Sequence, residues 1–308
     1  MASPMAEADD VRVRVAGKIN LALRSGPRRD DGYHGLSTVF QAVSLYDEVI
    51  ARWAEPGQIS VTVTGDQADL VPTDESNLAV RAARLLRDLV ATTEVGVALE
   101  IHKAIPVTGG MAGGSADAAA ALLACSVLWD LDISPEQMRE LGARLGADVP
   151  FCLTGGTALG ADRGDQLMPV LTRGTYHWVL GFGEGELSTP AVFARFDDLG
   201  LGGDGPEDVP PALMNALVSG DPVALGAALV NDLQPAALAL RPQLAEALET
   251  GMELGAVGAI VSGSGPTVAF LAATEVEAID LAAQLSTRGL FRGVKRVQGP
   301  VAGARLLD

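Results

Sequence analysis

The sequence contains few cysteines, histidines and aromatic residues. Its two cysteines, Cys125 and Cys152, both have apolar neighbours, which is more typical of buried small side chains in a reducing compartment than of a disulfide or a metal site. The three histidines, His34, His102 and His177, and the two cysteines are too few to build a zinc-type cluster. Aromatic residues make up 4% of the chain, so we expect a core built mainly from alanine, valine and leucine.

Basic residues are also scarce, with 22 against 39 acidic residues and a formal net charge of −17. Because nucleic-acid-binding proteins usually carry a basic field, this balance argues against a nucleic-acid partner. No apolar run approaches the roughly 20 residues that span a bilayer, and residues 1–10 lack the basic and apolar regions of a signal peptide. We therefore expect a cytoplasmic protein with no membrane partner. Nothing in the sequence distinguishes a monomer from a homodimer.

Strand and helix patterns follow one another in an irregular order. Residues 76–91 have a helical period with Ser76 as the expected N-cap. Ser134, Pro135 and Gln137 form a capping-box pattern that predicts a helix from about residue 135 to Leu145, ending at Gly146. We expect strands at residues 11–15, 59–64, 95–101, 155–159, 257–261, 267–271 and 293–297. This order is typical of an α+β protein rather than of a repeating βαβ chain.

Residues 105–125 change abruptly from a glycine-rich loop to an alanine-rich helix. A glycine run that opens a helix exposes unpaired backbone N–H groups near the positive end of the helix dipole, where an anion such as phosphate can bind. The loop lacks the lysine of a Walker motif and the initial G-x-G of a dinucleotide fingerprint. A glycine-rich connection that only lets a helix pack tightly remains the structural alternative.

Three segments together resemble the GHMP small-molecule kinases, a family named for galactokinase, homoserine kinase, mevalonate kinase and phosphomevalonate kinase. The segments are AGKINL at residues 16–21, PVTGGMAGGSADAAA at residues 106–120 and SGSGPT at residues 262–267. The resemblance implies an α+β, two-domain GHMP kinase fold with the active site in the interdomain cleft. It implies an ATP-binding and catalytic N-terminal domain over residues 1–170 and a C-terminal domain over residues 171–308. The glycine-, aspartate- and proline-rich residues 199–209 predict a surface loop in the second domain.

ATP and Mg²⁺ are the cofactors that the resemblance implies. Asp148 is then the general base and Lys18 its partner, in keeping with the needs of phosphoryl transfer to an alcohol. Ser115 is the candidate oxygen ligand for Mg²⁺. Asn77 and Lys103 match positions that approach adenine, although a helix cap and a solvated strand residue are equally open interpretations. The loop residues expected at the nucleotide are Pro106, Val107, Thr108, Gly109, Gly110, Met111, Ala112, Gly113, Gly114, Ser115, Ala116 and Asp117.

The acceptor is suggested by DDGYH at residues 30–34, followed by TVF at residues 38–40. These segments resemble one member of the family that phosphorylates a cytidine diphosphate sugar alcohol, a small-molecule partner. The residues expected at this substrate are Asn20, Tyr33, His34, Thr189 and Phe193. Ala194 stands where the family can have a basic residue. Because ATP and this substrate are both anionic, we expect Lys18, Lys103 and the loop amides, with Arg28 and Arg29, to make a positive pocket.

Three other functions remain open from the sequence. A GHMP kinase for another alcohol, of the homoserine or mevalonate type, would leave Tyr33 and His34 without a base to bind. A catalytically silent nucleotide-binding sensor is disfavoured by the presence of both Lys18 and Asp148. A dehydrogenase is disfavoured most, because the glycine pattern does not fit a dinucleotide-binding loop.

Overall fold

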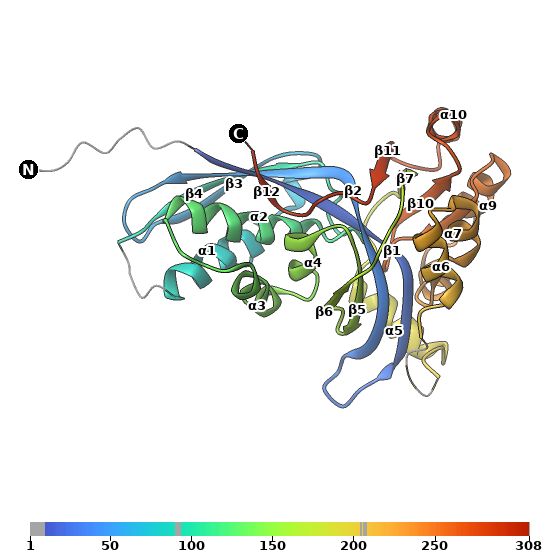
Figure 1. Cartoon of the computed structure of the whole chain (residues 1–308), viewed down its shortest axis with the longest axis horizontal. Helices are drawn as coiled ribbons and strands as arrows, with labels where there is room; N and C mark the ends of the chain where they lie inside the picture. Colours follow the sequence, from blue (N-terminus) through green and yellow to red (C-terminus); the bar gives the residue numbers. More distant parts are fainter. Residues whose placement is uncertain (1–9, 90–93, 204, 206–207, 308) are drawn as a thin grey trace, which may run out of the picture.

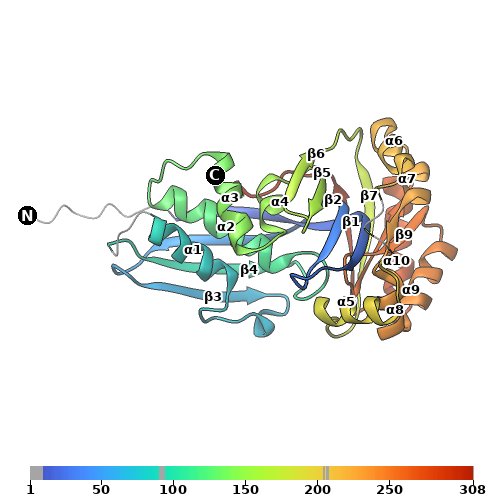
Figure 2. The same ribbon diagram turned by 90° about the horizontal axis from the view of Figure 1, so that it is seen from below.

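The computed structural model describes residues 10–89, 94–203, 205 and 208–307. These residues form two sheets, each with helices packed against it (Figures 1 and 2). In the larger sheet, β12, β1, β2, β4 and β3 are neighbours in that order, while β8 pairs with β1, β5 with β2, and β6 with β5. Its strands are β1 (Val11–Arg28), β2 (His34–Trp53), β3 (Ile59–Gly65), β4 (Val97–Lys103), β5 (Thr157–Asp162), β6 (Gln166–Pro169), β8 (Val230–Asn231) and β12 (Arg305–Leu306).

The long β1–β2 hairpin organises the first half of the molecule, and the sequence predicted only its beginning. The expected strand at residues 11–15 continues to residue 28, and β2 was not expected at all. Residues 15–23 are almost all buried, so the alternation that marks a half-buried strand ends although the strand continues. The register of β1 against β2 shifts on both sides of Lys18, and such bulges redirect the side chains around them.

Four helices lie along one face of this sheet in Figure 1, and α2 packs directly against β1 and β2. They are α1 (Leu78–Leu89), α2 (Gly113–Leu128), α3 (Pro135–Leu145) and α4 (Val149–Thr154). The capping box of Ser134 and Gln137 and the end of α3 at Gly146 are confirmed. The expected cap of α1 is wrong: Asn77 Oδ1 accepts from the Ala79 N–H at 2.8 Å. Residues 90 and 91 of that expected helix lie outside the described residues.

The smaller sheet has the order β11, β7, β10 and β9, with every pair antiparallel. Its strands are β7 (Tyr176–Phe182), β9 (Gly258–Val261), β10 (Thr267–Ala272) and β11 (Gly293–Gly299). The helices of this half are α5 (Thr189–Asp198), α6 (Pro211–Ser219), α7 (Pro222–Ala228), α8 (Gln234–Leu240), α9 (Gln243–Glu253) and α10 (Glu275–Ser286). The described part of the expected 199–209 loop has neither helix nor strand. Residues 204, 206 and 207 of that loop lie outside the described residues.

Segments late in the chain complete the first sheet. In β12, Leu306 is opposite Val13 of β1, and β8 runs parallel to the later part of β1. Just before β12, the N–H of Ala304 donates to the carbonyl of Cys152 in α4 at 2.8 Å. The α+β class is confirmed, whereas the division of the chain at residue 170 stays a prediction. Among the described residues, no helix has the length and apolar character needed to cross a membrane.

Candidate active site

A cavity of about 1100 Å³ lies where the two halves of the molecule meet. It is lined by Lys18, Asn20 and His34 from the β1–β2 hairpin and by the start of α2, and on the other side by residues of α5 and of the β9–β10 turn. The expected site residues that line it are Lys18, Asn20, Tyr33, His34, Thr108, Gly109, Gly110, Ala112, Gly113, Gly114, Ser115, Asp148, Thr189 and Phe193. The structure thus brings together residues that are up to 175 positions apart, from Lys18 to Phe193.

The glycine loop reaches the cavity through a backbone with several left-handed residues. Thr108, Gly110 and Ala112 have φ values of 50°, 75° and 60°, a conformation that costs non-glycine residues free energy and is typical of functional loops. α2 begins directly after Ala112, and the first-turn N–H groups of a helix have no partner within it. Gly113, Gly114 and Ser115 of this first turn line the cavity, which makes it a site for an anion.

The carbonyl of Gly110 joins all three sequence motifs. It accepts from Lys18 Nζ at 3.0 Å and from Ser262 Oγ at 3.0 Å. A Cβ on Gly110 would lie 2.0 Å from the Ser262 carbonyl oxygen, so only glycine fits this contact. The β9–β10 turn is also attached to α5, because the hydroxyls of Thr189 and Ser264 are 2.9 Å apart.

Lys18 is a buried cation whose ammonium group is held by two hydrogen bonds, one to Asn20 and one to the Gly110 carbonyl. Its Nζ donates to Asn20 Oδ1 at 2.6 Å, and Asn20 Nδ2 donates in turn to Thr38 Oγ1 at 2.8 Å. Burial lowers the pKa of Lys18, and the nearby negative charge of Asp148 opposes this shift. A lysine in this setting can neutralise a developing negative charge or titrate at a lower pH than an exposed one.

Asp148 lies at the N-terminus of α4 and lines the same cavity as Lys18. Within the described part of the chain, its carboxylate accepts no hydrogen bond from the first turn of α4. Its oxygens therefore do not serve as a helix cap and can accept a proton or a hydrogen bond from a molecule in the cavity. Cys152, one turn further along α4, is buried, and burial raises the pKa of its thiol. Both cysteines are free and buried, as expected from the sequence.

The far end of the cavity is aromatic. The rings of His34 and Phe193 stack with centroids 4.6 Å apart and an interplanar angle of 25°. His34 Nδ1 donates to the Gly26 carbonyl at 2.9 Å, and its Nε2 lies 3.5 Å from Asp197 Oδ1. Tyr33 has 58% of its surface exposed at the rim. A flat, partly apolar ligand with polar edges fits such an end.

Lys103 and Asp117, expected at the nucleotide, do not line the cavity. Lys103 Nζ contacts Asp47 Oδ2 and donates to Asp117 Oδ2 at 2.8 Å, and all three side chains are at most 4% exposed. Asp47 Oδ1 also accepts from the backbone N–H groups of Ala104 and Ile105. Burial raises the pKa of Asp117 to about 8 although Lys103 opposes the shift. Lys103 is buried in this cluster, so the alternative of a solvated strand residue is wrong, whereas its expected contact with the nucleotide stays a prediction.

Five other expected nucleotide residues also lie outside the cavity lining. Pro106 and Val107 lie beside Gln67, whose Oε1 accepts from the Val107 N–H at 3.1 Å. Met111 and Ala116 are buried in the core. Asn77 is buried and caps α1, as the alternative interpretation proposed.

Several cavity residues were not found by sequence reasoning. Thr38, Arg144, Arg163 and Asp197 line the cavity, and Asp47 supports it from behind. An acidic pair, Asp47 and Glu48, within the apolar pattern of β2 was the available signal for Asp47. The others are ordinary polar residues whose position depends on the tertiary fold.

Comparison with known proteins gives the family. The family models for the N-terminal and C-terminal domains of GHMP kinases match residues 77–156 and 213–289. Proteins named 4-diphosphocytidyl-2-C-methyl-D-erythritol kinase are similar over almost the whole chain. The one from Cutibacterium acnes is 51% identical over 301 residues, which cover 96% of this chain and 97% of that protein. The one from Mycobacterium tuberculosis is 52% identical over 299 residues, which cover 97% and 93%.

A solved structure agrees with these relatives. A crystal structure of 4-(cytidine 5'-diphospho)-2C-methyl-D-erythritol kinase matches with a TM-score of 0.77 and 30% identity, over 93% of this chain and 98% of that chain. The cavity at the glycine loop therefore lies in a known kinase architecture. The chain belongs to the GHMP kinases and, within them, to the family of the 4-diphosphocytidyl-2-C-methyl-D-erythritol kinases.

Proposed function

We propose that this chain transfers the γ-phosphoryl group of ATP to the 2-hydroxyl of 4-diphosphocytidyl-2-C-methyl-D-erythritol, a step of the non-mevalonate pathway to isoprenoid precursors. The names of its close relatives support this substrate. The observation that carries the proposal is one cavity with a glycine loop, the Lys18–Asp148 pair and a His34–Phe193 stack. Its volume is slightly above the usual range for sites that bind one small molecule, which suits two ligands bound together.

The start of α2 supports the binding of the ATP phosphates. Backbone N–H groups of Gly113, Gly114 and Ser115 meet them at the positive end of the helix dipole. Mg²⁺ binds chiefly to nucleotide phosphates and takes one or two protein oxygens. The Ser115 hydroxyl is at the loop and can be such a ligand. When bound, Mg²⁺ neutralises charge on the transferring phosphoryl group.

Asp148 and Lys18 carry the chemistry in this proposal. The 2-hydroxyl oxygen forms a bond to the γ-phosphorus while the bond to the ADP oxygen breaks, and Asp148 takes the hydroxyl proton. Lys18, held by Asn20 and the Gly110 carbonyl, stabilises the negative charge that develops on the attacking oxygen. The buried position of Lys18 strengthens this interaction because water screens it poorly.

The charges that line the cavity support an anionic pair of substrates. Lys18, Arg28, Arg144 and Arg163 line it, against the carboxylates of Asp148 and Asp197. A chain of net charge −17 thus has more cations than anions at this surface. Such a local excess attracts ATP and a nucleoside diphosphate against the overall field.

The aromatic end favours this substrate over the alternatives. A homoserine- or mevalonate-type acceptor has no ring to place against His34 and Phe193. A silent sensor does not need the oriented Lys18 beside Asp148. The diphosphocytidyl substrate gives both features a role, because its base binds at the His34–Phe193 stack and its hydroxyl reacts beside Lys18 and Asp148.

The deciding experiment measures ADP release with Mg-ATP, with and without the diphosphocytidyl substrate. We expect release that depends on this substrate, and a loss of about 10²–10⁴-fold in turnover for Asp148→Asn. CDP and ATP affinities should be retained in that variant, because its shape is unchanged. Asp132→Asn, at an exposed residue away from the cavity, is the matched control. Turnover that requires homoserine or mevalonate instead would contradict the substrate assignment.

The proposal includes a cytoplasmic location, a monomeric or homodimeric state and a division of the chain near residue 170. Sedimentation of the purified protein tests the oligomeric state. Limited proteolysis tests the division, which predicts early cleavage between the two sheets.

A further inference from the structure

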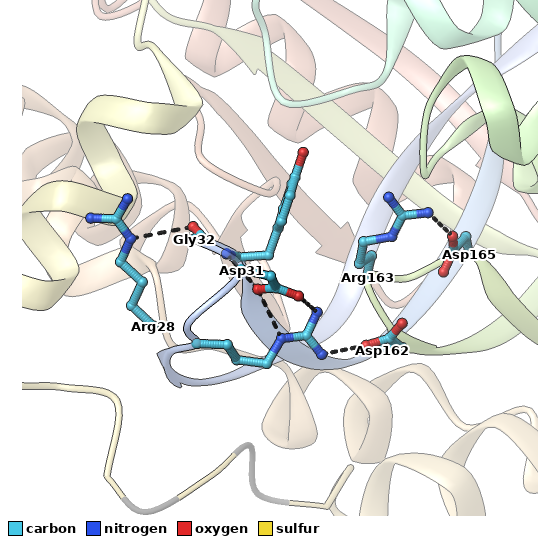
Figure 3. Close-up of polar contacts among 8 residues, drawn as sticks. Arg28, Asp31, Gly32, Asp162, Arg163 and Asp165 are labelled. Carbon is cyan, nitrogen blue, oxygen red and sulfur yellow. Dashed lines mark hydrogen bonds and ion pairs between the residues drawn. The ribbon is translucent and has the colours of Figure 1, made fainter.

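The tip of the β1–β2 hairpin, residues 29–33, contacts the end of β5 and the turn that leads to β6, residues 162–165, called the β5–β6 turn below (Figure 3). Arg29 Nη1 donates to Asp162 Oδ1 at 2.5 Å, and Arg29 Nη2 donates to Asp31 Oδ2 at 2.9 Å. Asp31 Oδ1 accepts in turn from the backbone N–H of Tyr33 at 3.0 Å. A continuous chain of contacts therefore runs from the β5–β6 turn to Tyr33.

The same turn places a second arginine beside the ring of Tyr33. Arg163 Cζ is 5.9 Å from the centroid of the Tyr33 ring. Its guanidinium is oriented by Asp165, whose Oδ2 accepts from Arg163 Nη2 at 2.6 Å (Figure 3). Arg163 and Tyr33 both line the cavity, as does Arg28, whose Nε donates to the Gly32 carbonyl at 3.3 Å.

The contact between the hairpin tip and the β5–β6 turn contributes little to the stability of the fold. Arg29 and Asp162 are 37% and 38% exposed, and ion pairs of that exposure contribute little to folding. Yet Asp162 holds a left-handed backbone with φ of 60°, which is costly for a residue other than glycine. The strained backbone at Asp162 and the two ordered side chains of Arg29 and Arg163 indicate a role in ligand binding.

We propose that the Arg29–Asp162 pair is a latch that positions Tyr33 and Arg163 for the cytidine diphosphate part of the substrate. The inference rests on the proposed function. In the latched tip, the Tyr33 ring covers the nucleoside and the Arg163 guanidinium contacts its diphosphate. Arginine suits this task because its planar fork binds two phosphate oxygens at once. Arg163 is then a specificity-determining residue, while Arg29 and Asp162 are positioning residues.

The test compares Asp162→Asn and Arg163→Met with Glu100→Gln. Asparagine tolerates the left-handed backbone and keeps the shape of Asp162 while it removes the charge. Glu100→Gln breaks a similarly exposed ion pair, Arg52–Glu100, which is 41% and 29% exposed and does not line the cavity. Calorimetry with CDP and steady-state kinetics with the full substrate and Mg-ATP are measured on the whole chain.

We expect Asp162→Asn, which opens the latch, and Arg163→Met, which removes the positioned side chain, each to weaken CDP binding and raise the KM for the cytidine substrate by about tenfold, as for loss of one charge-assisted contact. The KM for ATP and the melting temperature should match those of wild-type protein and Glu100→Gln. If Asp162→Asn or Arg163→Met binds CDP with the same affinity as Glu100→Gln does, the proposed latch is wrong. A parallel loss of ATP affinity would also overturn it, because the defect would then be general. Wild-type protein that ignores CDP would overturn the proposed function, and the latch with it.

Discussion

Lys103 Nζ donates to Asp117 Oδ2 at 2.8 Å behind the glycine loop, and its other carboxylate partner is Asp47. The pair joins the end of β4 to the first turns of α2, and so fixes both ends of the loop between them. The cavity face of the loop is thereby left to backbone N–H groups. Lys103 thus supports the glycine loop without lining the cavity.

Lys103→Met should be strongly destabilising, by about 3–5 kcal/mol, because it leaves two buried carboxylates without a cation. Asp117→Asn keeps the shape of the side chain and a hydrogen bond to Lys103, so we expect a loss of about 1 kcal/mol or less. Urea unfolding of the two variants measures the difference. Equal stabilities would show that the cluster is not held together by the charge of Lys103.

Gly110→Ala should destabilise the loop, because the residue has φ of 75° and its Cβ would lie 2.0 Å from the Ser262 carbonyl. The strained conformation alone costs about 1–3 kcal/mol. Gly114→Ala is the matched control: its Cβ would meet Leu78 at an ordinary 3.6 Å, at the start of a helix. Thermal unfolding should show a lower melting temperature for Gly110→Ala only. A similar drop in both variants would argue against the Gly110–Ser262 contact as the cause.

The activity should fall at alkaline pH below the range of an ordinary lysine, because burial lowers the pKa of Lys18. In the proposed reaction the protonated form stabilises the developing oxyanion, so kcat should decline as the pH rises through this lowered pKa. The measurement is a pH profile of kcat with saturating substrates. A profile that stays flat up to the ordinary lysine pKa of 10.5 would contradict the required charge.

The stability of the fold should rise, not fall, as Lys18 loses its charge at alkaline pH. Its folded-state pKa is lower than its unfolded-state pKa, so the charged form is a cost that is fully present below the folded-state pKa and is relieved as the pH rises through it. Lys18→Met removes this cost, although it also removes two hydrogen bonds. We expect a melting temperature at neutral pH at least equal to that of wild-type protein, with turnover lost. A large drop in melting temperature would mean that the hydrogen bonds outweigh the burial cost.

Phe193→Leu should weaken cytidine binding while ATP binding stays unchanged. Leucine keeps an apolar side chain but loses the face that stacks on His34. Stacking on a base is worth about 1–3 kcal/mol, which sets the expected loss in CDP affinity. Calorimetry with CDP and with ATP separates the two sites. Unchanged CDP affinity would place the base elsewhere in the cavity.

Local signals predicted α3 and three strands of the smaller sheet, but little of the β1–β2 hairpin. The capping box at Ser134 and the strands β9, β10 and β11 depend on residues that are close in the sequence, and the structure has them as expected. β1 and β2 are buried on both faces along much of their length, so the alternation that reveals a strand is absent there. Their long pairing depends on the remainder of the fold.

The site was predicted in outline through three motifs, and the structure adds the direction in which each side chain points. Lys18 and Asp148 are 130 positions apart, and only the fold brings them to one cavity. Lys103 was misplaced because a lysine at the end of a strand has the same sequence pattern whether it faces solvent or a buried carboxylate. Its partner Asp47 lies in a strand that the sequence did not reveal.

The return of residues 304–306 to the first sheet has a consequence for synthesis on the ribosome. α4, which begins next to Asp148, ends against a segment that is translated only after the whole second half of the chain. A nascent chain that already contains β1, β2 and the glycine loop still lacks the strand and the backbone hydrogen bonds that complete this wall. Chains that terminate shortly before residue 304 would then resemble the full protein over most of their length and still hold Asp148, the proposed general base, less firmly.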